Sequence, residues 1–200
     1  MGGFVQLEAN ILLWIQEYLR NDFLDPIVKF ITHLGDDGYL WIGLLLLLLC
    51  IPKTRKSALM GAATLLLTFI VTNLCLKPMI ARVRPYEAIE GLTRIIEKQS
   101  DRSFPSGHTA NSMAVGVILW MISQNYKKLG DKKLYFPKAA GWICLILSIL
   151  IGLSRLYVGV HYPTDVLGGA VIAIVDAMIV FKIYKRQWNR KKEMYRKMHE

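Results

Sequence analysis

The chain has 200 residues, of which 54% are hydrophobic, and it carries a formal net charge of +10. A soluble domain of this length is rarely so apolar, whereas a membrane protein with basic loops commonly is. The basic residues stand in short clusters between long apolar runs and not along one solvated face, which argues against nucleic acid as a partner. The composition indicates one small bundle of membrane helices, with the lipid bilayer as its partner.

The first 35 residues predict helices that lie along the membrane surface. Between residues 4 and 34, charged residues interrupt every apolar run, while Leu7, Ile11 and Trp14 recur at helical spacing. This pattern is typical of an amphipathic interfacial helix, and Asp25-Pro26 resembles the start of a second short helix. A sixth, imperfect membrane span is the alternative interpretation.

Five apolar segments then approach the roughly 20 residues that a helix needs to cross the ~30 Å hydrocarbon core. They run approximately over residues 38–51, 57–76, 108–123, 139–156 and 164–183. We therefore expect an all-α integral membrane protein, a bundle of five to six transmembrane helices with N-terminal interfacial amphipathic helices. The expected organisation is interfacial helices over 1–35, a membrane-embedded domain over 36–185 and a basic cytoplasmic tail over 186–200.

The positions of Lys and Arg predict the orientation. Sixteen of the 25 such residues fall in the loop 52–56, the loop 126–138 and the tail from 182 onward. Alternate spans would bring these segments to one side, and short loops rich in Lys and Arg remain in the cytoplasm. The loops 77–107 and 155–163 are then predicted to lie on the extracytoplasmic face of a multi-pass plasma-membrane protein.

Three short stretches in the two outer loops indicate chemistry. They are KPMIARVRP over residues 77–85, PSGH over 105–108 and SRLYVGVHYPTD over 154–165. Each one alone is common at a helix end. Together they bring three cations, two imidazoles, a carboxylate and a helix N-terminus to one membrane face, and such a set favours phosphoryl transfer.

Five residues are predicted to bind the phosphate. Lys77, Arg84 and Arg155 can hold its equatorial oxygens with positive charge. Ser106 and Gly107 stand where a helix begins and exposes backbone N–H groups to an anion. Gly107 lets the backbone approach closely, and Ser106 can either cap the helix or donate its hydroxyl.

Two histidines fit the remaining roles of in-line transfer, a nucleophile and an acid for the leaving group. Asp165 follows His161 by four residues and can fix its tautomer, which predicts His161 as the nucleophile. His108 has no carboxylate at such spacing and is predicted to protonate the leaving oxygen. No cluster of acids, histidines or cysteines indicates a metal site, so neither a metal nor another cofactor is expected.

The three stretches resemble the signature of the type 2 phosphatidic acid phosphatase superfamily. Its pattern is Lys, six residues, Arg-Pro; then Pro-Ser-Gly-His; then Ser-Arg, five residues, His, three residues, Asp. The chain matches it throughout, and the resemblance covers roughly residues 36–185. It implies a helical membrane bundle, metal-independent hydrolysis and the same residue roles, with His161, His108 and Asp165 as catalytic residues.

Within that superfamily the short chain is similar to the small bacterial undecaprenyl pyrophosphate phosphatases, which implies a membrane lipid phosphate as the substrate. Phosphatidylglycerophosphate, phosphatidate and diacylglycerol pyrophosphate are alternative substrates, and a lipid phosphotransferase is an alternative activity. A transporter on the same scaffold would need polar residues along several spans, where only Asp176 stands isolated within one. His33, beside Gly35 and Asp36, is expected to have a surface or capping role.

Overall fold

The computed structural model describes residues 3–131 and 134–199, and every regular element in these ranges is a helix. In chain order the elements are α1 (Gly3–Trp14), η1 (Ile15–Leu19), α2 (Leu24–His33), η2 (Asp36–Gly38), α3 (Tyr39–Cys50), α4 (Arg55–Phe69), η3 (Ile70–Leu76), α5 (Lys77–Ile80), α6 (Pro85–Ala88), α7 (Gly107–Leu129), α8 (Lys138–Tyr157) and α9 (Pro163–Lys197). The expected all-α fold is confirmed.

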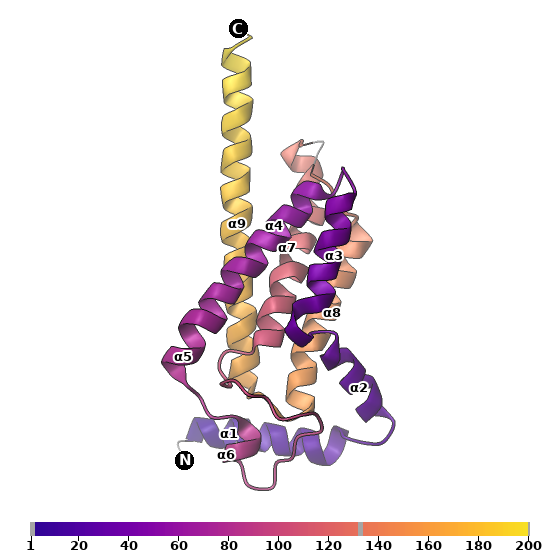
Figure 1. Ribbon diagram of the computed structural model, residues 1–200, viewed down its shortest axis with the longest axis vertical. Helices are drawn as coiled ribbons and strands as arrows, with labels where there is room; N and C mark the ends of the chain where they lie inside the picture. Colours follow the sequence, from indigo (N-terminus) through magenta and orange to yellow (C-terminus); the bar gives the residue numbers. More distant parts are fainter. Residues whose placement is uncertain (1–2, 132–133, 200) are drawn as a thin grey trace.

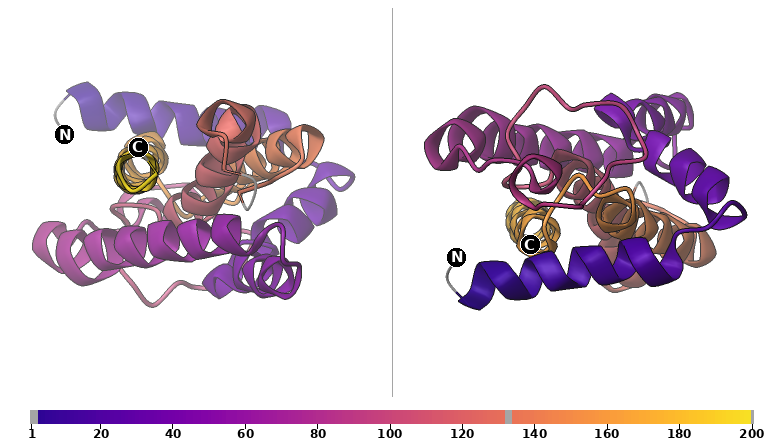
Figure 2. Two further views of the ribbon diagram at one scale, coloured as in Figure 1. Left: turned by 90° about the horizontal axis from the view of Figure 1, so that it is seen from above. Right: turned by 90° about the horizontal axis from the view of Figure 1, so that it is seen from below.

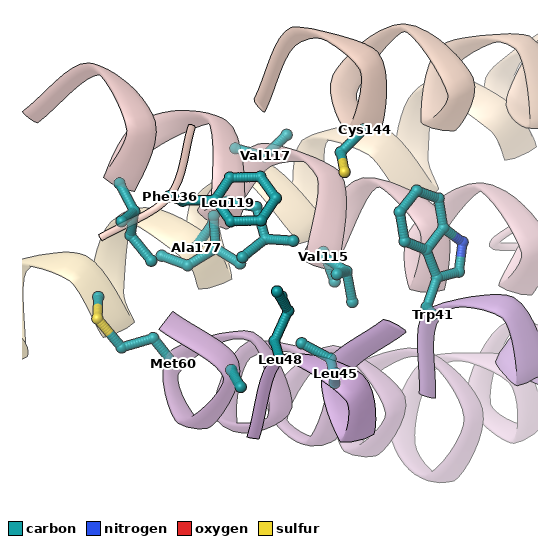
Figure 3. Close-up of a cluster of buried hydrophobic side chains, with 14 of the residues drawn as sticks. Trp41, Leu45, Leu48, Met60, Val115, Val117, Leu119, Phe136, Cys144 and Ala177 are labelled. Atoms are coloured by element: carbon teal, nitrogen blue, oxygen red, sulfur yellow. The ribbon is translucent and has the colours of Figure 1, made fainter. Parts of the chain in front are cut away.

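Helix α7 forms the centre of the bundle, with α4, α8 and α9 packed around it and α3 against α4 (Figures 1 and 2). A buried apolar cluster joins Trp41 and Leu45 of α3 to Val115 and Leu119 of α7 (Figure 3). Polar contacts also connect the helices, because Ser148 of α8 donates a 2.8 Å hydrogen bond to a backbone carbonyl of α7. Close packing and such interhelical hydrogen bonds are what hold helices together in lipid.

Three helical stretches among the described residues are long and apolar enough to cross a membrane: Arg55–Ala88, Lys138–Tyr157 and Pro163–Lys197. The pair Leu24–His33 and Asp36–Cys50, bent by 45°, is a fourth if it forms one span. Helix α7 coincides with a further expected span but is more polar, because other helices, and not lipid, cover it. The membrane class is confirmed, while the number of five to six spans stays a prediction.

The N-terminal helices lie at one end of the bundle, where α1 and η1 run across its axis (Figure 1). Ala9 and Leu12 of α1 are buried against the protein, whereas Leu7 and Trp14 are exposed. Helix α2 begins at Leu24, immediately before Asp25-Pro26, as expected. An exposed apolar face on a helix across the bundle axis supports the interfacial position, which stays a prediction.

The same end of the bundle collects α6, the 89–106 loop and the connection from α8 to α9 (Figure 1). The opposite end collects the turn after α3, the end of α7 and the basic end of α9. Lys132 and Lys133, part of the predicted basic loop, lie outside the described residues. Helix α9 continues to Lys197, well past the expected end of the last span, and residues 184–197 contain neither Gly nor Pro to interrupt it.

Candidate active site

The predicted site residues converge at the end of the bundle that α1 crosses. A pocket of about 450 Å³ is lined by five of them: Lys77, Arg84, Gly107, His108 and His161. The other three, Ser106, Arg155 and Asp165, are fully buried. The three stretches that stand apart in the sequence therefore meet at one place.

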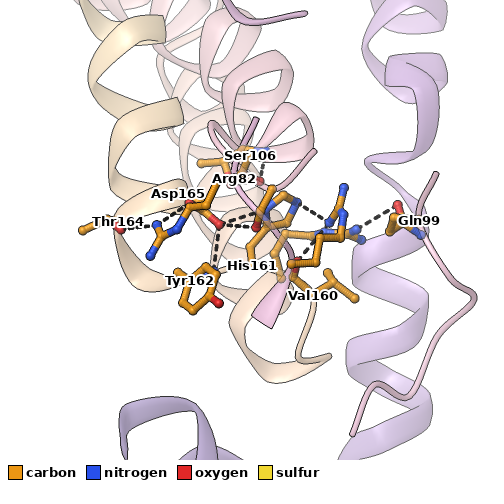
Figure 4. A network of polar contacts seen from close by, with 12 residues as sticks. Arg82, Gln99, Ser106, Val160, His161, Tyr162, Thr164 and Asp165 are labelled. Atoms are coloured by element: carbon orange, nitrogen blue, oxygen red, sulfur yellow. Dashed lines mark hydrogen bonds and ion pairs between the residues drawn. The ribbon is translucent and has the colours of Figure 1, made fainter. Parts of the chain in front are cut away.

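His161 lies in the connection between α8 and α9, with each ring nitrogen beside a charged group (Figure 4). Arg84 Nη1 donates to His161 Nε2 over 3.2 Å. A guanidinium can only donate, so Nε2 is the acceptor and the ring proton is on Nδ1. Nδ1 lies 3.5 Å from Oδ2 of Asp165 and makes no hydrogen bond within the described residues. The carboxylate of Asp165 therefore lies beside the His161 ring, as expected, but farther from it than a hydrogen bond requires.

Burial sets the protonation state of His161. Loss of solvent lowers the pKa of this imidazole to about 3, and the cations Arg84 and Arg155 act in the same direction while Asp165 opposes them. The ring is therefore neutral at physiological pH. An uncharged imidazole with its proton on Nδ1 has a lone pair at Nε2, which is the atom that a nucleophile needs.

Asp165 is held by donors on several sides. As part of a capping box at the start of α9 it accepts the backbone N–H of Tyr162 over 2.9 Å. It also accepts the hydroxyl of Ser103 over 2.5 Å and Nη1 of Arg82 over 2.7 Å (Figure 4). These contacts fix the carboxylate beside His161 before any substrate binds.

Sequence reasoning missed the role of Arg82, which is the other arginine of KPMIARVRP. Arg82 Nη2 binds Oε2 of Glu8 over 2.5 Å, and the guanidinium lies 3.7 Å from the centre of the Tyr162 ring. Glu8 itself is buried, at 2% exposure, although it belongs to the amphipathic helix α1. An acid at a position that faces the protein was the one signal that could have indicated this contact.

Lys77 and Arg84 share one carboxylate, that of Asp101 in the 89–106 loop. Lys77 Nζ binds Oδ2 of Asp101, while Arg84 Nη2 binds Oδ1 over 2.5 Å. Burial raises the pKa of Asp101, but the hydrogen bonds and charges of Lys77 and Arg84 outweigh it and hold that pKa at about 2. A carboxylate that is ionised at physiological pH therefore occupies the position between two cations that were predicted to bind phosphate.

Arg155 lies behind the pocket with neutral partners. Its Nη1 donates to Oγ1 of Thr32 over 2.6 Å and its Nη2 to Oε1 of Gln99 over 3.3 Å. Nε has no partner within the described residues. A buried guanidinium with an unused donor favours an anionic ligand nearby, and Gln99 connects Arg155 to the pocket wall.

At the start of α7, the helix N-terminus lies beside the ammonium group of Lys77. Ser106 caps the helix, accepting the backbone N–H of Thr109 over 3.4 Å and its hydroxyl over 2.9 Å. Of the two roles expected for Ser106, the structure has the cap. A Cβ on Gly107 would lie 3.2 Å from Nζ of Lys77, so the glycine leaves room for that ammonium group at the helix N-terminus.

His108 has a carboxylate partner after all. Its Nε2 lies 2.7 Å from Oδ1 of Asp36, a residue 72 positions away in the chain. His108 has no carboxylate four residues away, as the sequence indicates, but folding brings η2 against α7 and supplies one from a distant part of the chain.

A helical membrane bundle whose polar pocket combines two histidines with clustered cations is the architecture of an integral membrane phosphatase. Residues 57–189 match the model of the PAP2 superfamily, and the chain belongs to this family. This is the type 2 phosphatidic acid phosphatase superfamily that its motifs resemble, so that prediction is confirmed. The chain is thus a membrane lipid phosphatase.

Several known proteins are similar to this chain over most of its length. The bacitracin transport permease protein BcrC of Bacillus licheniformis is 29% identical, covering 90% of this chain and 81% of that protein. The undecaprenyl-diphosphatase BcrC of Bacillus subtilis is 31% identical, covering 82% and 76%. The crystal structure of a transmembrane PAP2-type phosphatidylglycerolphosphate phosphatase from Bacillus subtilis superposes with a TM-score of 0.73 at 27% identity, covering 93% of this chain and 88% of that chain.

Proposed function

We propose that this chain hydrolyses undecaprenyl pyrophosphate to undecaprenyl phosphate and inorganic phosphate through a phosphohistidine at His161. The observation that carries the proposal is a polar pocket joined to an apolar groove. The groove, of about 360 Å³, runs between α3 and α4, and Asp37, Phe69 and Asn111 line both cavities. A lipid with a charged headgroup fits the pair, with its headgroup beside His161 and its chain along the groove.

The first chemical step forms a phosphorus–nitrogen bond. His161 Nε2 attacks the terminal phosphorus of the bound pyrophosphate, and the bond from that phosphorus to the bridging oxygen breaks. His108 gives its proton to the departing oxygen of undecaprenyl phosphate. The phosphorylated imidazole carries a positive charge with its proton on Nδ1, and the Asp165 carboxylate, 3.5 Å away, stabilises it.

The second step returns the enzyme to its starting state. Water attacks the phosphorus, His108 takes a proton from that water, and the phosphorus–nitrogen bond breaks to release phosphate. His161 is again neutral. Lys77 and Arg84 hold the equatorial oxygens in both steps, so we expect positive charge from the protein to replace a metal ion.

A pyrophosphate headgroup suits the charge of the pocket. Three cations (Lys77, Arg84 and Lys98) and two carboxylates (Asp37 and Asp101) line it, and a second phosphate gives the headgroup more charge with which to compete with Asp101 for Lys77 and Arg84. A phosphate is also a better leaving group than an alkoxide. The relationship to the undecaprenyl-diphosphatase of Bacillus subtilis, at 31% identity, supports this choice.

One observation favours a second candidate substrate. The Bacillus subtilis phosphatidylglycerolphosphate phosphatase shares the fold over 93% of this chain. Phosphatidylglycerophosphate is therefore the alternative, with the same phosphohistidine chemistry and an alcohol as leaving group.

Competition between lipids tests the proposal. Purified protein in detergent receives undecaprenyl pyrophosphate, phosphatidylglycerophosphate and phosphatidate at equal surface concentration, and phosphate release from each is measured. We expect the highest kcat/KM for undecaprenyl pyrophosphate, no release by His161→Ala, and an acid-labile phosphoenzyme in the wild type alone. A preference for phosphatidylglycerophosphate would favour the second candidate, and a phosphoenzyme in His161→Ala would contradict the nucleophile assignment.

A further inference from the structure

Asp36 lies between two imidazoles that come from different elements. Its Oδ1 is 2.7 Å from Nε2 of His108 at the start of α7, and its Oδ2 is 2.7 Å from Nδ1 of His33 at the end of α2. His33 faces outward with 56% of its side chain exposed, whereas 17% of the His108 side chain is exposed. The carboxylate thus connects a surface histidine to one that lines the active-site pocket.

Gly35 brings Asp36 this close to His108. A Cβ on Gly35 would lie 2.9 Å from Cδ2 of His108 and 2.7 Å from Cγ2 of Ile151, so no larger residue fits without movement. The chain then makes the one-turn helix η2 and enters α3. The imidazole of His108 is therefore enclosed by backbone on one side and fixed by a carboxylate at Nε2.

We propose that Asp36 is the positioning residue of His108, fixing the imidazole through Nε2–H so that Nδ1 exchanges the proton with the leaving oxygen. This inference rests on the acid role of His108 in the proposed function. A carboxylate can only accept, so the Nε2 proton stays in the bond to Asp36. Nδ1 is then the ring nitrogen left for the pocket.

The proton balance follows from this arrangement. The first step requires His108 as the imidazolium, with a proton on each nitrogen, and the Asp36 carboxylate favours that charged form. The Nδ1 proton moves to the leaving oxygen as the phosphorus–oxygen bond breaks, and His108 becomes the neutral Nε2–H tautomer. In the second step Nδ1 takes a proton from the attacking water, while Asp36 remains ionised throughout. Asp36 thus acts on the ring as Asp165 is expected to act on His161, through the nitrogen that does not react.

His33 has a supporting part in this arrangement. It binds the second oxygen of Asp36, which limits rotation of the carboxylate about the Cβ–Cγ bond of Asp36. Two cations face the group formed by His33, Asp36 and His108. They are Arg155 of α8 and Lys77 of α5, and both act on His108 through their charge. Among the described residues neither forms a hydrogen bond or an ion pair with Asp36, so the two histidines make its direct contacts.

Kinetics with two leaving groups test the inference. Asp36→Ala removes the acceptor, Asp36→Asn keeps an acceptor oxygen without charge, and Asp22→Ala is the matched control on an exposed aspartate. Because a general acid contributes about 10²–10⁴-fold, we expect Asp36→Ala to lower kcat on phosphatidate by about tenfold or more, with little change in KM. The loss should be smaller for Asp36→Asn, absent for Asp22→Ala, and much reduced with p-nitrophenyl phosphate, which needs little protonation.

Two further results decide the outcome. In a His108→Ala background, Asp36→Ala should cause no additional loss, since it acts only through that ring. Equal losses on both substrates, or an additive loss in the double variant, would overturn the inference and indicate a general structural role. Nitrogen-15 NMR of labelled histidine, assigned with His108→Gln and recorded at a pH at which the ring is neutral, provides a readout that needs no substrate: the neutral His108 ring should carry its proton on Nε2 in the wild type and lose that preference in Asp36→Ala. An unchanged tautomer would also overturn the inference, whereas a wild type inactive on every lipid would refute only the proposed function.

Discussion

Arg82 Nη1 donates a 2.7 Å hydrogen bond to Oδ1 of Asp165, while the other carboxylate oxygen, Oδ2, faces His161. That other oxygen lies 3.5 Å from Nδ1 of His161. The guanidinium therefore holds the orienting carboxylate in place and balances its charge. Glu8 binds the same guanidinium, so two ion pairs connect helix α1 to Asp165, the carboxylate beside the proposed nucleophile His161.

Replacing Arg82 should impair turnover more than substrate binding. A hydrogen bond to a charged group contributes about 1.5–3 kcal/mol, which corresponds to roughly 10- to 100-fold in kcat. We expect Arg82→Ala to lose kcat on that scale with little change in KM, because Asp165 loses one of the donors that fix its carboxylate beside His161. Steady-state kinetics of phosphate release measures both constants. Arg190→Ala, an exposed arginine at the far end of α9, is the control, and an unchanged kcat in a folded Arg82→Ala protein would refute this role.

Removing the charge of Asp101 should strengthen anion binding. Its carboxylate pairs with Lys77 and Arg84, so an incoming phosphate has to displace it. A partly exposed ion pair contributes up to about 1 kcal/mol, and we expect Asp101→Asn to lower the inhibition constant of vanadate about fivefold. Glu97→Gln, an exposed acid of the same loop, should leave it unchanged. Weaker vanadate binding by Asp101→Asn would mean that Asp101 organises the two cations instead of competing for them.

The buried His161 should make the protein less stable in acid. Its folded pKa of about 3 lies below the ordinary value of 6.5, because burial disfavours the charged ring. Between those two pH values the unfolded chain binds the extra proton, so stability falls as pH decreases, by at most about 1.4 kcal/mol per pH unit. Melting temperatures in detergent from pH 7 to pH 4 should fall more steeply for the wild type than for His161→Gln. Parallel curves for the two proteins would show that this histidine is not buried in its neutral form.

Cysteine labelling tests the proposed orientation. The active site and the clustered Lys and Arg residues lie at opposite ends of the bundle, so we expect the site on the extracytoplasmic face (Figure 1). Cys50 and Cys75 are exposed and must be replaced first. A membrane-impermeant maleimide added to whole cells should label Glu90→Cys and spare Lys53→Cys, both of which are exposed positions. The reverse pattern would place the site in the cytoplasm.

Much of the fold was predictable from the chain alone. Apolar runs of sufficient length fixed where α3, α4, α8 and α9 occur, and Asp25-Pro26 marked the start of α2. The end of α9 was not predictable from hydropathy, because hydropathy indicates which residues favour lipid and not where a helix ends beyond them. The role of α1 was also hidden, since amphipathicity indicates an exposed face and a covered face but not which residues cover it.

The sequence by itself determined the type of chemistry. Cations, imidazoles and a carboxylate stand at the ends of the predicted helices in the sequence: Lys77, Arg84, His108, His161 and Asp165. The tertiary structure decided which residues hold them in place. Asp36 reaches His108 across 72 residues, Arg82 joins Glu8 to Asp165, and Asp101 pairs with two phosphate-binding candidates. Spacing along one helix reports only neighbours three or four residues apart, whereas these carboxylates arrive from other elements that meet only when the bundle packs.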